Sequence, residues 1–372
     1  MTTRFEVQRN DIRRGHWSTG TSEPGSGGVR VGIDLFALTA NNITYAAFGD
    51  ALGYWQHFPT DDPATGAVPV WGFGTVRESR CDGVQVGERL YGYFPIADDV
   101  VLYPEDISEA SFRDGAEHRR DLPPIYAQYQ RCAADTGSPE REPLQAILRP
   151  QFSTSFLLDD FLAANEYFGA DTVLLSSASS KTAYGTAFCL AQRRDAARIV
   201  GLTSAANVAF TRSLGCFHDV LTYEQISRSL TEIPSVYVDF SGDMGVRSAV
   251  HRRLGERLTY DCSVGATHWD ADPGAAAIPG PDPVLFFAPA QAAQRAAEWG
   301  AAGLRDRLDT AWTAFLDQVT RPGDPWLTVV TGRGRDAVED CYARLFGRPG
   351  TCPGRSRAGG VRFPHHRFTE PR

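Results

Sequence analysis

The chain has 372 residues, 42% of them hydrophobic, and a formal net charge of −8 at pH 7. This length and composition predict two domains with large apolar cores, and the acidic balance disfavours nucleic acid or an anionic membrane surface as the main partner. No stretch has the length and apolarity of a transmembrane helix, and the polar N-terminus lacks the apolar core of a signal peptide. The seven cysteines are scattered and never spaced as C-x-x-C, which favours reduced thiols and a cytoplasmic location.

The first part of the chain contains short apolar runs separated by glycines. Residues 29–40 alternate like a half-buried strand, residues 68–76 predict a strand with glycine bends, and residues 83–93 predict a turn that leads into another strand. This pattern is typical of a small β-barrel, so we predict a β-rich domain over residues 1–150. Within it, residues 104–150 form a long connection, which is either a lid over a site or, as we prefer, a structural insertion.

A strand–turn–helix–strand pattern follows in residues 171–204. Residues 172–175 (TVLL) have the composition of a buried strand, residues 176–180 (SSASS) are small and polar, and residues 182–192 have helical spacing. A second apolar run over residues 198–202 completes a βαβ unit. Its turn would direct several backbone N–H groups and a helix N-terminus at one point, which suits a pyrophosphate.

The turn of this unit lacks the glycines of the usual G-x-G-x-x-G motif. Serine and alanine are the next smallest residues, and only Gly185 could serve close helix packing. Hydroxyl groups and the ammonium group of Lys181 could add donors to the phosphates, although a sheet helix that is merely capped by serines would give the same pattern. The candidate cofactor-binding residues of the turn are Ser177, Ala178, Ser179, Ser180, Lys181 and Thr182.

The end of the second strand of this unit predicts the cofactor. An acidic residue there would bind the ribose hydroxyl of NAD and repel a 2′-phosphate, but Thr203, Ser204 and Asn207 follow the strand without an acid. Their hydroxyl and amide groups can donate to a phosphate, and Arg212 can add charge. We therefore predict NADP(H); the alternative is that Ser204 only caps the helix over residues 208–214.

Strands and helices continue to alternate as far as residue 287. This alternation predicts a doubly wound parallel sheet over residues 151–284. Beyond it the pattern is mostly helical, and apolar periodicity continues although the βα alternation stops. We predict that residues 285–372 return to the first domain.

Motifs in both predicted domains resemble those of the medium-chain dehydrogenase/reductase superfamily. Residues 69–76 (PVWGFGTV) resemble its P-x-x-x-G-x-G-x-V strand, residues 83–92 are similar to its G-x-x-V-G-D-R-V-x-G hairpin, and residues 210–216 resemble the helix and turn before its third sheet strand. Asn42 and the Gly53-Tyr54 pair also match. The phrases TSFLLDDF, SSASSKTA, SLGCF and GATHWD resemble a domain-of-unknown-function branch of that superfamily.

The resemblance is to the zinc-free quinone-reductase and enoyl-reductase members. It implies an α/β fold in which a doubly wound, Rossmann-like parallel-sheet domain accompanies a GroES-like β-rich domain. Zinc-dependent members carry a cysteine near residue 41 and a His-Glu pair near residue 72, and this chain has neither. It also lacks their closely spaced four-cysteine lobe, so we expect no metal.

The same resemblance implies an NADPH-dependent oxidoreductase that transfers hydride to a small activated alkene, quinone or carbonyl compound. Tyr54 matches a tyrosine that donates a proton in some relatives, Asn42 matches a position near the nicotinamide, and Thr154 matches a residue beside the cofactor. Tyr45 is a second candidate for catalysis. The alternative for Tyr54 is an aromatic ring that only packs against its neighbours.

Residues 265–270 (GATHWD) follow a predicted strand end, where open α/β sheets bind ligands. Gly265 is a candidate cofactor-binding residue, and His268 is a candidate general acid or base. Two other functions therefore stay open. One is a non-redox lyase or hydrolase that uses His268 and Asp239, and the other is a nucleotide-binding protein without catalysis. A small-molecule substrate is expected if the protein is an oxidoreductase, a lyase or a hydrolase. Whether the chain forms a homodimer is left open.

Overall fold

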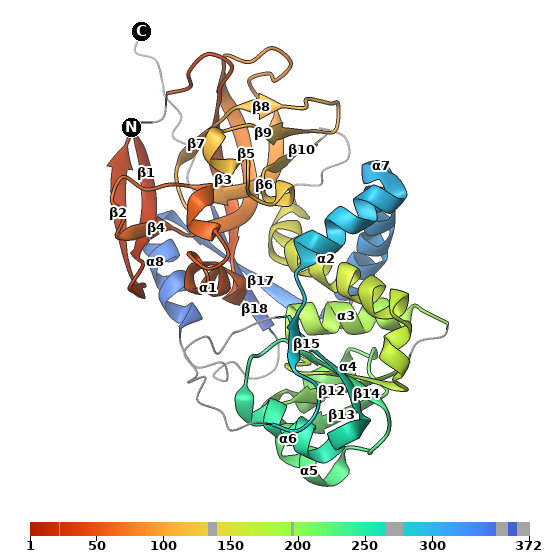
Figure 1. Cartoon of the computed structure of the whole chain (residues 1–372). Helices are drawn as coiled ribbons and strands as arrows, with labels where there is room; N and C mark the ends of the chain where they lie inside the picture. Colours follow the sequence, from red (N-terminus) through yellow and green to blue (C-terminus); the bar gives the residue numbers. More distant parts are fainter. Residues whose placement is uncertain (22, 133–139, 195–196, 265–277, 347–355, 363–372) are drawn as a thin grey trace. The chain divides into compact units, whose positions relative to one another are not determined.

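The structure is a computed structural model that describes residues 1–372 except 22, 133–139, 195–196, 265–277, 347–355 and 363–372 (Figure 1). The chain divides into two compact units. Unit 1 comprises Met1–Ile147, Val329–Arg348 and Ala358–Arg372, and unit 2 comprises Leu148–Thr328 and Pro349–Arg357. The return to the first unit therefore begins at Val329, whereas the sequence prediction placed it at residue 285.

Unit 1 is built mainly of antiparallel strands. A three-stranded sheet has the order β2-β1-β4, and a nine-stranded sheet has the order β17-β18-β3-β5-β6-β10-β9-β8, with β7 paired to β3. The strands are β1 (Thr2–Gln8), β2 (Asp11–Gly20), β3 (Val29–Leu38), β4 (Thr65–Ala67), β5 (Pro69–Ser79), β6 (Arg89–Pro95), β7 (Asp99–Leu102), β8 (Pro104–Glu105), β9 (Ser111–Asp114), β10 (Gln128–Cys132), β17 (Leu327–Arg333) and β18 (Ser356–Arg362). Its helices are α1 (Ala40–Ala47), η1 (Tyr54–His57), η2 (Glu117–Arg119), η3 (Pro124–Tyr126) and α8 (Gly334–Leu345).

Glycines in β5 and β6 allow the central strands of unit 1 to pack closely. A Cβ atom on Gly72 would lie 2.3 Å from the carbonyl oxygen of Leu35 on β3, and one on Gly92 would lie 2.4 Å from the Tyr129 ring. Such distances exclude a side chain at either position. Gly72 of the matched strand motif and Gly92 of the hairpin motif are therefore explained by contact between neighbouring strands.

The long connection that begins at residue 104 extends the larger sheet. β10 pairs with β6, β9 pairs with β10, and β8 pairs with β9. Phe112 and Tyr129 are fully buried there, and the buried Arg119 forms an ion pair with Asp114 at 3.0 Å. The described part of this connection is thus a structural extension of the sheet.

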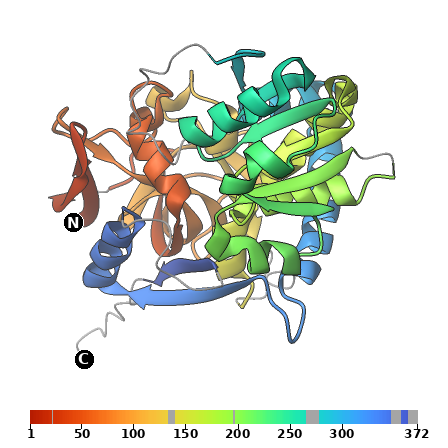
Figure 2. The same cartoon turned by 90° about the horizontal axis from the view of Figure 1, so that it is seen from below.

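Unit 2 contains a six-stranded, wholly parallel sheet with helices on both faces (Figures 1 and 2). The strand order β13-β12-β11-β14-β15-β16 is the 3-2-1-4-5-6 order of doubly wound folds, and it reverses between β11 and β14. The strands are β11 (Thr172–Leu175), β12 (Arg198–Thr203), β13 (Asp219–Thr222), β14 (Ser235–Asp239), β15 (Leu258–Ser263) and β16 (Pro283–Leu285). The helices are α2 (Glu142–Ala164), which starts in unit 1, α3 (Lys181–Ala191), α4 (Val208–Ser213), α5 (Ile226–Ser229), α6 (Met244–Leu254) and α7 (Ala288–Val319), with the short η4 (Glu166–Gly169), η5 (Ala205–Asn207), η6 (Tyr223–Gln225) and η7 (Gly255–Arg257).

Helix α7 packs on the sheet domain through aromatic side chains. The rings of Phe315 on α7 and Phe152 on α2 stack with centroids 4.5 Å apart, and Phe315 also lies 5.3 Å from Phe188 on α3. Gly300, with φ 76° and ψ 154°, kinks α7 into two helical segments. These contacts explain why the helical pattern after residue 288 belongs to unit 2.

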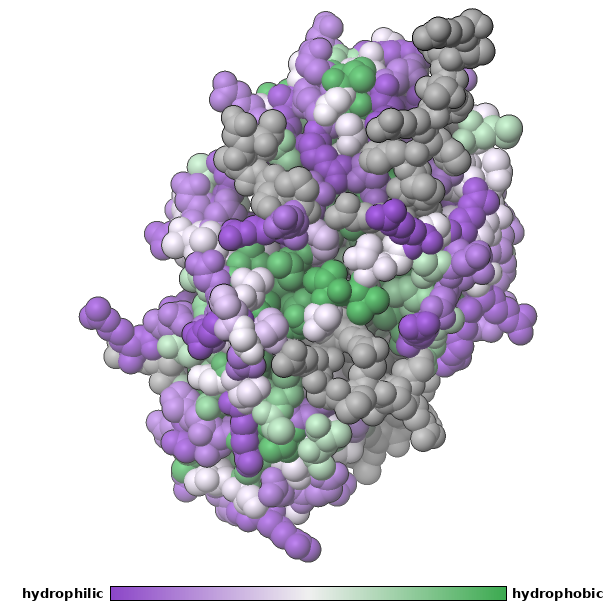
Figure 3. Space-filling view, turned by 180° about the vertical axis from the view of Figure 1, so that it is seen from behind, coloured by the Kyte–Doolittle hydropathy of each residue, from purple (hydrophilic) through white to green (hydrophobic). Residues whose placement is uncertain are grey.

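The surface drawn in Figure 3 is covered largely by hydrophilic residues, with apolar residues gathered in patches between them. Among the helices that the structure describes, none is both long enough and apolar enough to span a membrane.

Candidate functional site

The turn between β11 and α3 lies at the carboxyl edge of the parallel sheet, beside the point where the strand order reverses. All four residues of β11 are buried, so the chain leaves the core directly into this turn. Ser180 is the N-cap of α3, and its hydroxyl group accepts a hydrogen bond from the backbone N–H of Ala183 at 3.4 Å. Open α/β sheets bind their ligands at this edge.

The backbone donors of the turn fall into two groups. Ser176, Ala178 and Ser180 donate to the carbonyl oxygens of Val238, Leu202 and Ser177, at 3.0, 3.0 and 2.7 Å. Within the described residues, the N–H groups of Ser179, Lys181 and Thr182 meet no acceptor. A buried or half-buried N–H group normally has a partner. Three neighbouring donors without one, at a helix N-terminus, form a cradle for an anion.

Lys181 adds a cation to this cradle. It is the only lysine in the chain, and every other residue in the count of 37 Lys and Arg is arginine. Its side chain is half-buried, and burial lowers its pKa from 10.5 to about 8. In the part of the chain that the structure describes, no carboxylate or other acceptor pairs with it. An unpaired, partly desolvated ammonium group favours an incoming anion.

Ser177 has an unusual backbone conformation for a residue with a side chain. Its φ is 46°, in the left-handed region that glycine adopts at little cost. Tyr223, which follows β13, lies beside Ser177, and burial raises the pKa of this tyrosine. Sequence reasoning missed Tyr223, although its place at the end of a predicted strand put it at the ligand-binding edge.

The end of β12 carries polar residues and no acid. Thr203 is buried, and its hydroxyl oxygen has no partner among the described residues. The Ser204 hydroxyl accepts a hydrogen bond from Asn207 at 3.1 Å and makes no side-chain cap to the following helix. Arg212 is exposed and donates to the Val220 carbonyl at 3.4 Å. The structure therefore gathers Thr203, Ser204 and Asn207 at one strand end.

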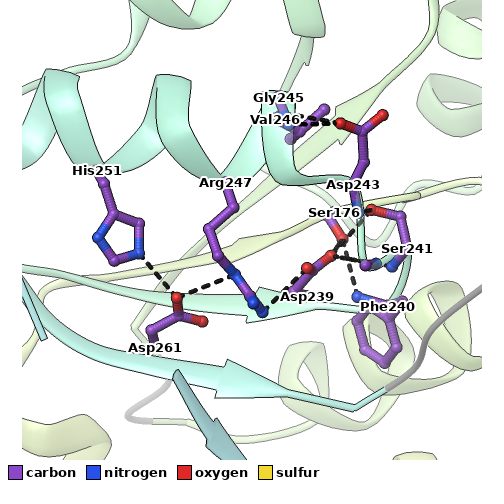
Figure 4. A network of polar contacts seen from close by, with 11 residues as sticks. Ser176, Asp239, Phe240, Ser241, Asp243, Gly245, Val246, Arg247, His251 and Asp261 are labelled. Atoms are coloured by element: carbon purple, nitrogen blue, oxygen red, sulfur yellow. Dashed lines mark hydrogen bonds and ion pairs between the residues drawn. The ribbon is translucent and has the colours of Figure 1, made fainter. Parts of the chain in front are cut away.

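A buried polar network lies at the neighbouring strand end, where β14 finishes (Figure 4). Oδ1 of the fully buried Asp239 accepts hydrogen bonds from the Ser176 hydroxyl at 2.7 Å, from the Ser241 hydroxyl and N–H at 2.9 Å, and from the Gly242 N–H at 3.2 Å. Its Oδ2 forms an ion pair with Arg247 of α6 at 3.1 Å. Asp239 is thus buried and ion-paired within the protein, and no face of it is open to a substrate.

The network continues from Arg247 to β15. Arg247 forms an ion pair with Asp261 at 3.1 Å, and Asp261 lies 2.7 Å from Nε2 of His251. Nδ1 of His251 lies 2.7 Å from the carbonyl oxygen of Pro279, which can only accept, so Nδ1 carries a hydrogen. A second proton must lie between Nε2 and the Asp261 carboxylate, because two lone pairs would otherwise face each other. The four ionisable groups therefore balance in charge, as a buried network requires.

The tyrosines proposed for catalysis lie together in unit 1. The rings of Tyr45 and Tyr54 have centroids 4.7 Å apart, and both are buried in a cluster with Phe58 and Tyr93. The Tyr54 hydroxyl lies 3.4 Å from that of Tyr126, and Trp71 donates to the Tyr45 hydroxyl at 3.2 Å. Burial raises the pKa of both Tyr45 and Tyr54. Sequence reasoning missed Tyr126, which comes from the connection that was interpreted as an insertion.

Two neighbours of this cluster hold structural positions. The Asn42 amide donates to the Pro69 carbonyl at 2.9 Å, and its oxygen accepts from the Thr39 N–H at 2.7 Å, which fixes the start of α1. These bonds occupy the side chain that the sequence placed near the nicotinamide. His57 is buried beside Tyr126, and burial lowers its pKa to about 3, so it is neutral.

The remaining predicted residues lie apart from these clusters or cannot be described. Thr154 is on α2, and its hydroxyl donates within the helix to the Pro150 carbonyl at 3.3 Å. The hydroxyl of its neighbour Ser155 lies 2.8 Å from the Thr182 carbonyl in the first turn of α3. Gly265 and His268 lie outside the described residues. Within the described part of the chain, no group of three or more His, Cys, Asp and Glu residues could hold a metal ion.

Solved structures with a similar fold include proteins described as NADPH:quinone reductases. CurA from Vibrio vulnificus, solved in complex with NADPH, is 13% identical, with a TM-score of 0.62 and coverage of 98% of this chain and 99% of CurA. A putative NADPH:quinone reductase from Mesorhizobium loti is 12% identical, with a TM-score of 0.60 and coverage of 97% and 98%. A similar protein from Bacillus thuringiensis is 11% identical, with a TM-score of 0.58 and the same coverage.

At these identities the likeness shows the fold alone. It combines a Rossmann-like parallel sheet with a separate, antiparallel GroES-like sheet, which confirms the fold class predicted from the motifs. Within that class, residues 36–349 match the family described as "Protein of unknown function (DUF2855)", and the chain belongs to this family. A search of curated proteins found no match.

Proposed function

We propose that this protein binds NADP(H) at the carboxyl edge of the unit 2 sheet and works as an oxidoreductase. The observation that carries the proposal is the cradle of Ser179, Lys181 and Thr182, whose backbone donors and ammonium group have no acceptor among the described residues. A pyrophosphate supplies the acceptors and the negative charge that this cradle needs. The complexes of fold relatives with NADPH support the same choice of ligand.

The choice of NADP(H) over NAD(H) rests on the end of β12. The 2′-phosphate would meet the hydroxyl and amide groups of Ser204 and Asn207, with Arg212 adding positive charge, and no carboxylate follows β12 to repel it. The buried Thr203 hydroxyl, which lacks a partner among the described residues, is a further donor at this strand end.

The proposed reaction is hydride transfer to a small activated alkene, quinone or carbonyl compound, for which the bound nicotinamide would supply the hydride. Tyr54 would hold the proton that the product takes up, and the neighbouring hydroxyl of Tyr126 would replace it. Tyr45, whose hydroxyl accepts from Trp71, would keep the Tyr54 ring in place through their contact. Quinone reductases among the fold relatives support this substrate class.

The two alternative functions, a lyase or hydrolase and a non-catalytic nucleotide-binding protein, have less support than an NADP(H)-dependent oxidoreductase. A lyase or hydrolase that uses Asp239 is disfavoured, because that carboxylate is fully buried and paired. Binding of the nucleotide without catalysis stays open. Consumption of NADPH in the presence of enones, quinones and enoyl thioesters distinguishes an oxidoreductase from a protein that only binds the nucleotide. The binding protein would show saturable binding with no turnover.

Lys181 offers a direct test of the nucleotide site because no other lysine competes for amine reagents. We expect NADPH to protect Lys181, but not the N-terminal amine, from reductive methylation, as measured by mass spectrometry. Charge-assisted contacts are worth about 1.5–3 kcal/mol, so Lys181→Ala should weaken NADPH binding by about ten- to a hundredfold. Adenosine fragments without a pyrophosphate should lose less. Equal labelling with and without NADPH, together with normal binding by Lys181→Ala, would contradict the site.

The tyrosine assignment needs a control for packing. Tyr54→Phe should lower the turnover number by about a hundredfold, the scale of a lost general acid, and leave the dissociation constant of NADPH unchanged. Tyr93→Phe is the matched control, because the Tyr93 hydroxyl is buried in the same cluster and has no partner among the described residues. Equal turnover in the two variants would remove Tyr54 from the mechanism.

We also propose that two copies of the chain associate through β16. This strand ends the sheet of unit 2, and its residues Val284 and Leu285 are 46% and 61% exposed. An edge strand with apolar side chains can pair with its own copy about a two-fold axis. Leu285→Lys should convert a dimer to a monomer in light scattering, whereas Val330→Lys, at another exposed apolar position, should not.

The free thiols of the six described cysteines fit a reducing compartment.

A further inference from the structure

Ser176 joins the two turns that border the ligand-binding edge (Figure 4). Its hydroxyl donates to Oδ1 of Asp239 at 2.7 Å and accepts from the N–H of Phe240 at 2.8 Å. Ser176 directly follows β11, and Asp239 and Phe240 end β14, so one hydroxyl group bridges the two strands where the sheet order reverses. The chain runs to opposite faces of a doubly wound sheet from such a point, so nothing in the ladder holds the two turns together beyond it.

Asp239 anchors the bridge to the core. Its Oδ1 also fixes the Ser241 and Gly242 N–H groups of the second turn, and Arg247 neutralises its charge through Oδ2. The adjoining Asp243 caps α6 by accepting from the N–H groups of Gly245 and Val246, at 2.8 and 3.1 Å. These hydrogen bonds fix the second turn, and the Ser176 hydroxyl joins the first turn to it.

The first turn needs such support because of Ser177. A non-glycine residue at φ 46° is less stable by about 1 kcal/mol than the same residue in a common conformation. Ser177 is held on one side by the covalent link to the bridged Ser176 and on the other by its contacts with Tyr223. Ser179, Lys181 and Thr182 follow closely and carry the N–H groups that meet no acceptor among the described residues, so the conformation of Ser177 sets where those donors point.

We propose that the Ser176–Asp239 clamp takes the place of the motif glycines and positions the anion cradle of this protein. A glycine-rich turn adopts its shape because glycine tolerates left-handed backbone, whereas this turn adopts its shape because a buried hydroxyl–carboxylate bridge fixes the preceding residue. Ser176 and Asp239 are thus positioning residues that touch no phosphate themselves. The inference rests on the proposed NADP(H) site.

Ser176→Ala is the first test, with Ser235→Ala as its matched control. Both serines are fully buried beside the β11–β14 pair. Ser176 directly follows β11, whereas Ser235 begins β14 at the opposite end of the paired strands. The Ser235 hydroxyl donates to the Ile233 carbonyl at 2.8 Å. Loss of one buried hydrogen bond changes an equilibrium by about five- to thirtyfold. We expect Ser176→Ala to raise the dissociation constant of NADPH by that factor and that of adenosine much less. Ser235→Ala should lower the melting temperature comparably and leave NADPH binding unchanged.

Rescue by glycine is the second test. In a Ser177→Gly protein the left-handed conformation of residue 177 is no longer strained. The Ser176–Asp239 clamp is then less necessary to maintain that conformation. Ser176→Ala should therefore weaken NADPH binding at least threefold less in the Ser177→Gly background than in the parent. A merely structural role for Ser176 would give the same loss in both backgrounds.

The outcomes separate this inference from the function on which it rests. A parent protein that does not bind NADPH overturns the proposed function. A parent that binds NADPH, with Ser176→Ala and Ser235→Ala binding it equally well, overturns the clamp and leaves the function standing. Binding that falls equally for both serine variants also overturns it, because general destabilisation would then explain the loss.

Discussion

The Ser155 hydroxyl on α2 lies 2.8 Å from the Thr182 carbonyl in the first turn of α3, and a Cβ atom on Gly185 would lie 2.7 Å from the same hydroxyl oxygen. The two helices therefore approach so closely that only glycine fits at residue 185. This contact holds the start of α3, and with it the anion cradle, against α2.

Gly185→Ala should destabilise the protein even though alanine favours helices. The added methyl group would push against Ser155, and such overpacking costs about 1–3 kcal/mol. Urea unfolding measures the change. Gly303→Ala on α7 is the control, because its nearest contact is Trp299 at 3.4 Å, and it should stabilise the protein by about 0.5–1 kcal/mol. The prediction fails if both variants are stabilised.

The affinity for NADPH should depend on pH through Lys181. Burial places its pKa at about 8 in the free protein, and a bound anion would raise that pKa because it stabilises the charged form. Affinity should therefore be constant below the free pKa and fall as the pH rises through it. Lys181→Arg should bind with no such fall, since the guanidinium stays charged. Fluorescence titration over this pH range measures both, and parallel curves would contradict the prediction.

Stability of the free protein should change in the opposite direction over the same range. Because the folded pKa of Lys181 lies below the unfolded value of 10.5, the unfolded state binds more protons between the two values. Unfolding free energy should thus gain a contribution from Lys181 as the pH rises through about 8. At neutral pH, Lys181→Met should stabilise the protein by about 1–2 kcal/mol, less than the whole shift because the side chain is half-exposed. A destabilised Lys181→Met protein would show that the ammonium group has an internal partner.

A carboxylate after β12 should reverse the cofactor preference. The parent protein should bind NADPH more tightly than NADH, and Ser204→Asp should prefer NADH, because a negative charge at the strand end repels a 2′-phosphate and accepts from a ribose hydroxyl. The ratio of the two dissociation constants is the measurement. Ser213→Asp, at the end of α4, controls for the added charge. Equal affinities of the parent for both nucleotides would rule the prediction out.

The buried network should be intolerant of the loss of its arginine. Arg247→Met leaves the buried Asp239 carboxylate without its cation and removes one of the two partners of Asp261, which typically costs about 3–5 kcal/mol. Arg198→Met removes an exposed ion pair with Asp219 and should change stability by less than about 1 kcal/mol. Thermal or urea unfolding of the two variants measures the difference. Similar losses would mean that the network does not carry the charge balance described above.

Much of the fold could be read from local pattern in the sequence. The buried run of β11, the small-residue turn and the helical spacing after it are local features, and they correctly predicted the βαβ unit because period and composition decide a strand or helix within a few residues. The glycines of β5 and β6 carried part of the superfamily resemblance, and in this chain they lie where close strand packing leaves no room for a side chain.

Contacts between distant residues could not be read in this way. That α7 packs on α2 and α3 depends on the fit of Phe315 between Phe152 and Phe188, and helical periodicity looks the same whichever unit a helix joins. The bonds of Asn42 to Thr39 and Pro69 could not be read from local pattern either, because they follow from the path of the backbone.

At the candidate site, local sequence pattern was enough to identify the residues of the turn, its lysine and the lack of an acid after β12. What holds the turn in place became clear only from contacts between distant residues. Ser176 and Asp239 are 63 residues apart, and only the pairing of β11 with β14 brings their side chains within 2.7 Å. The strength of that bridge comes from burial, since a hydroxyl–carboxylate contact in water would be exchanged freely for solvent. Burial at a single point is a property of the whole packed chain, and no local pattern contains it.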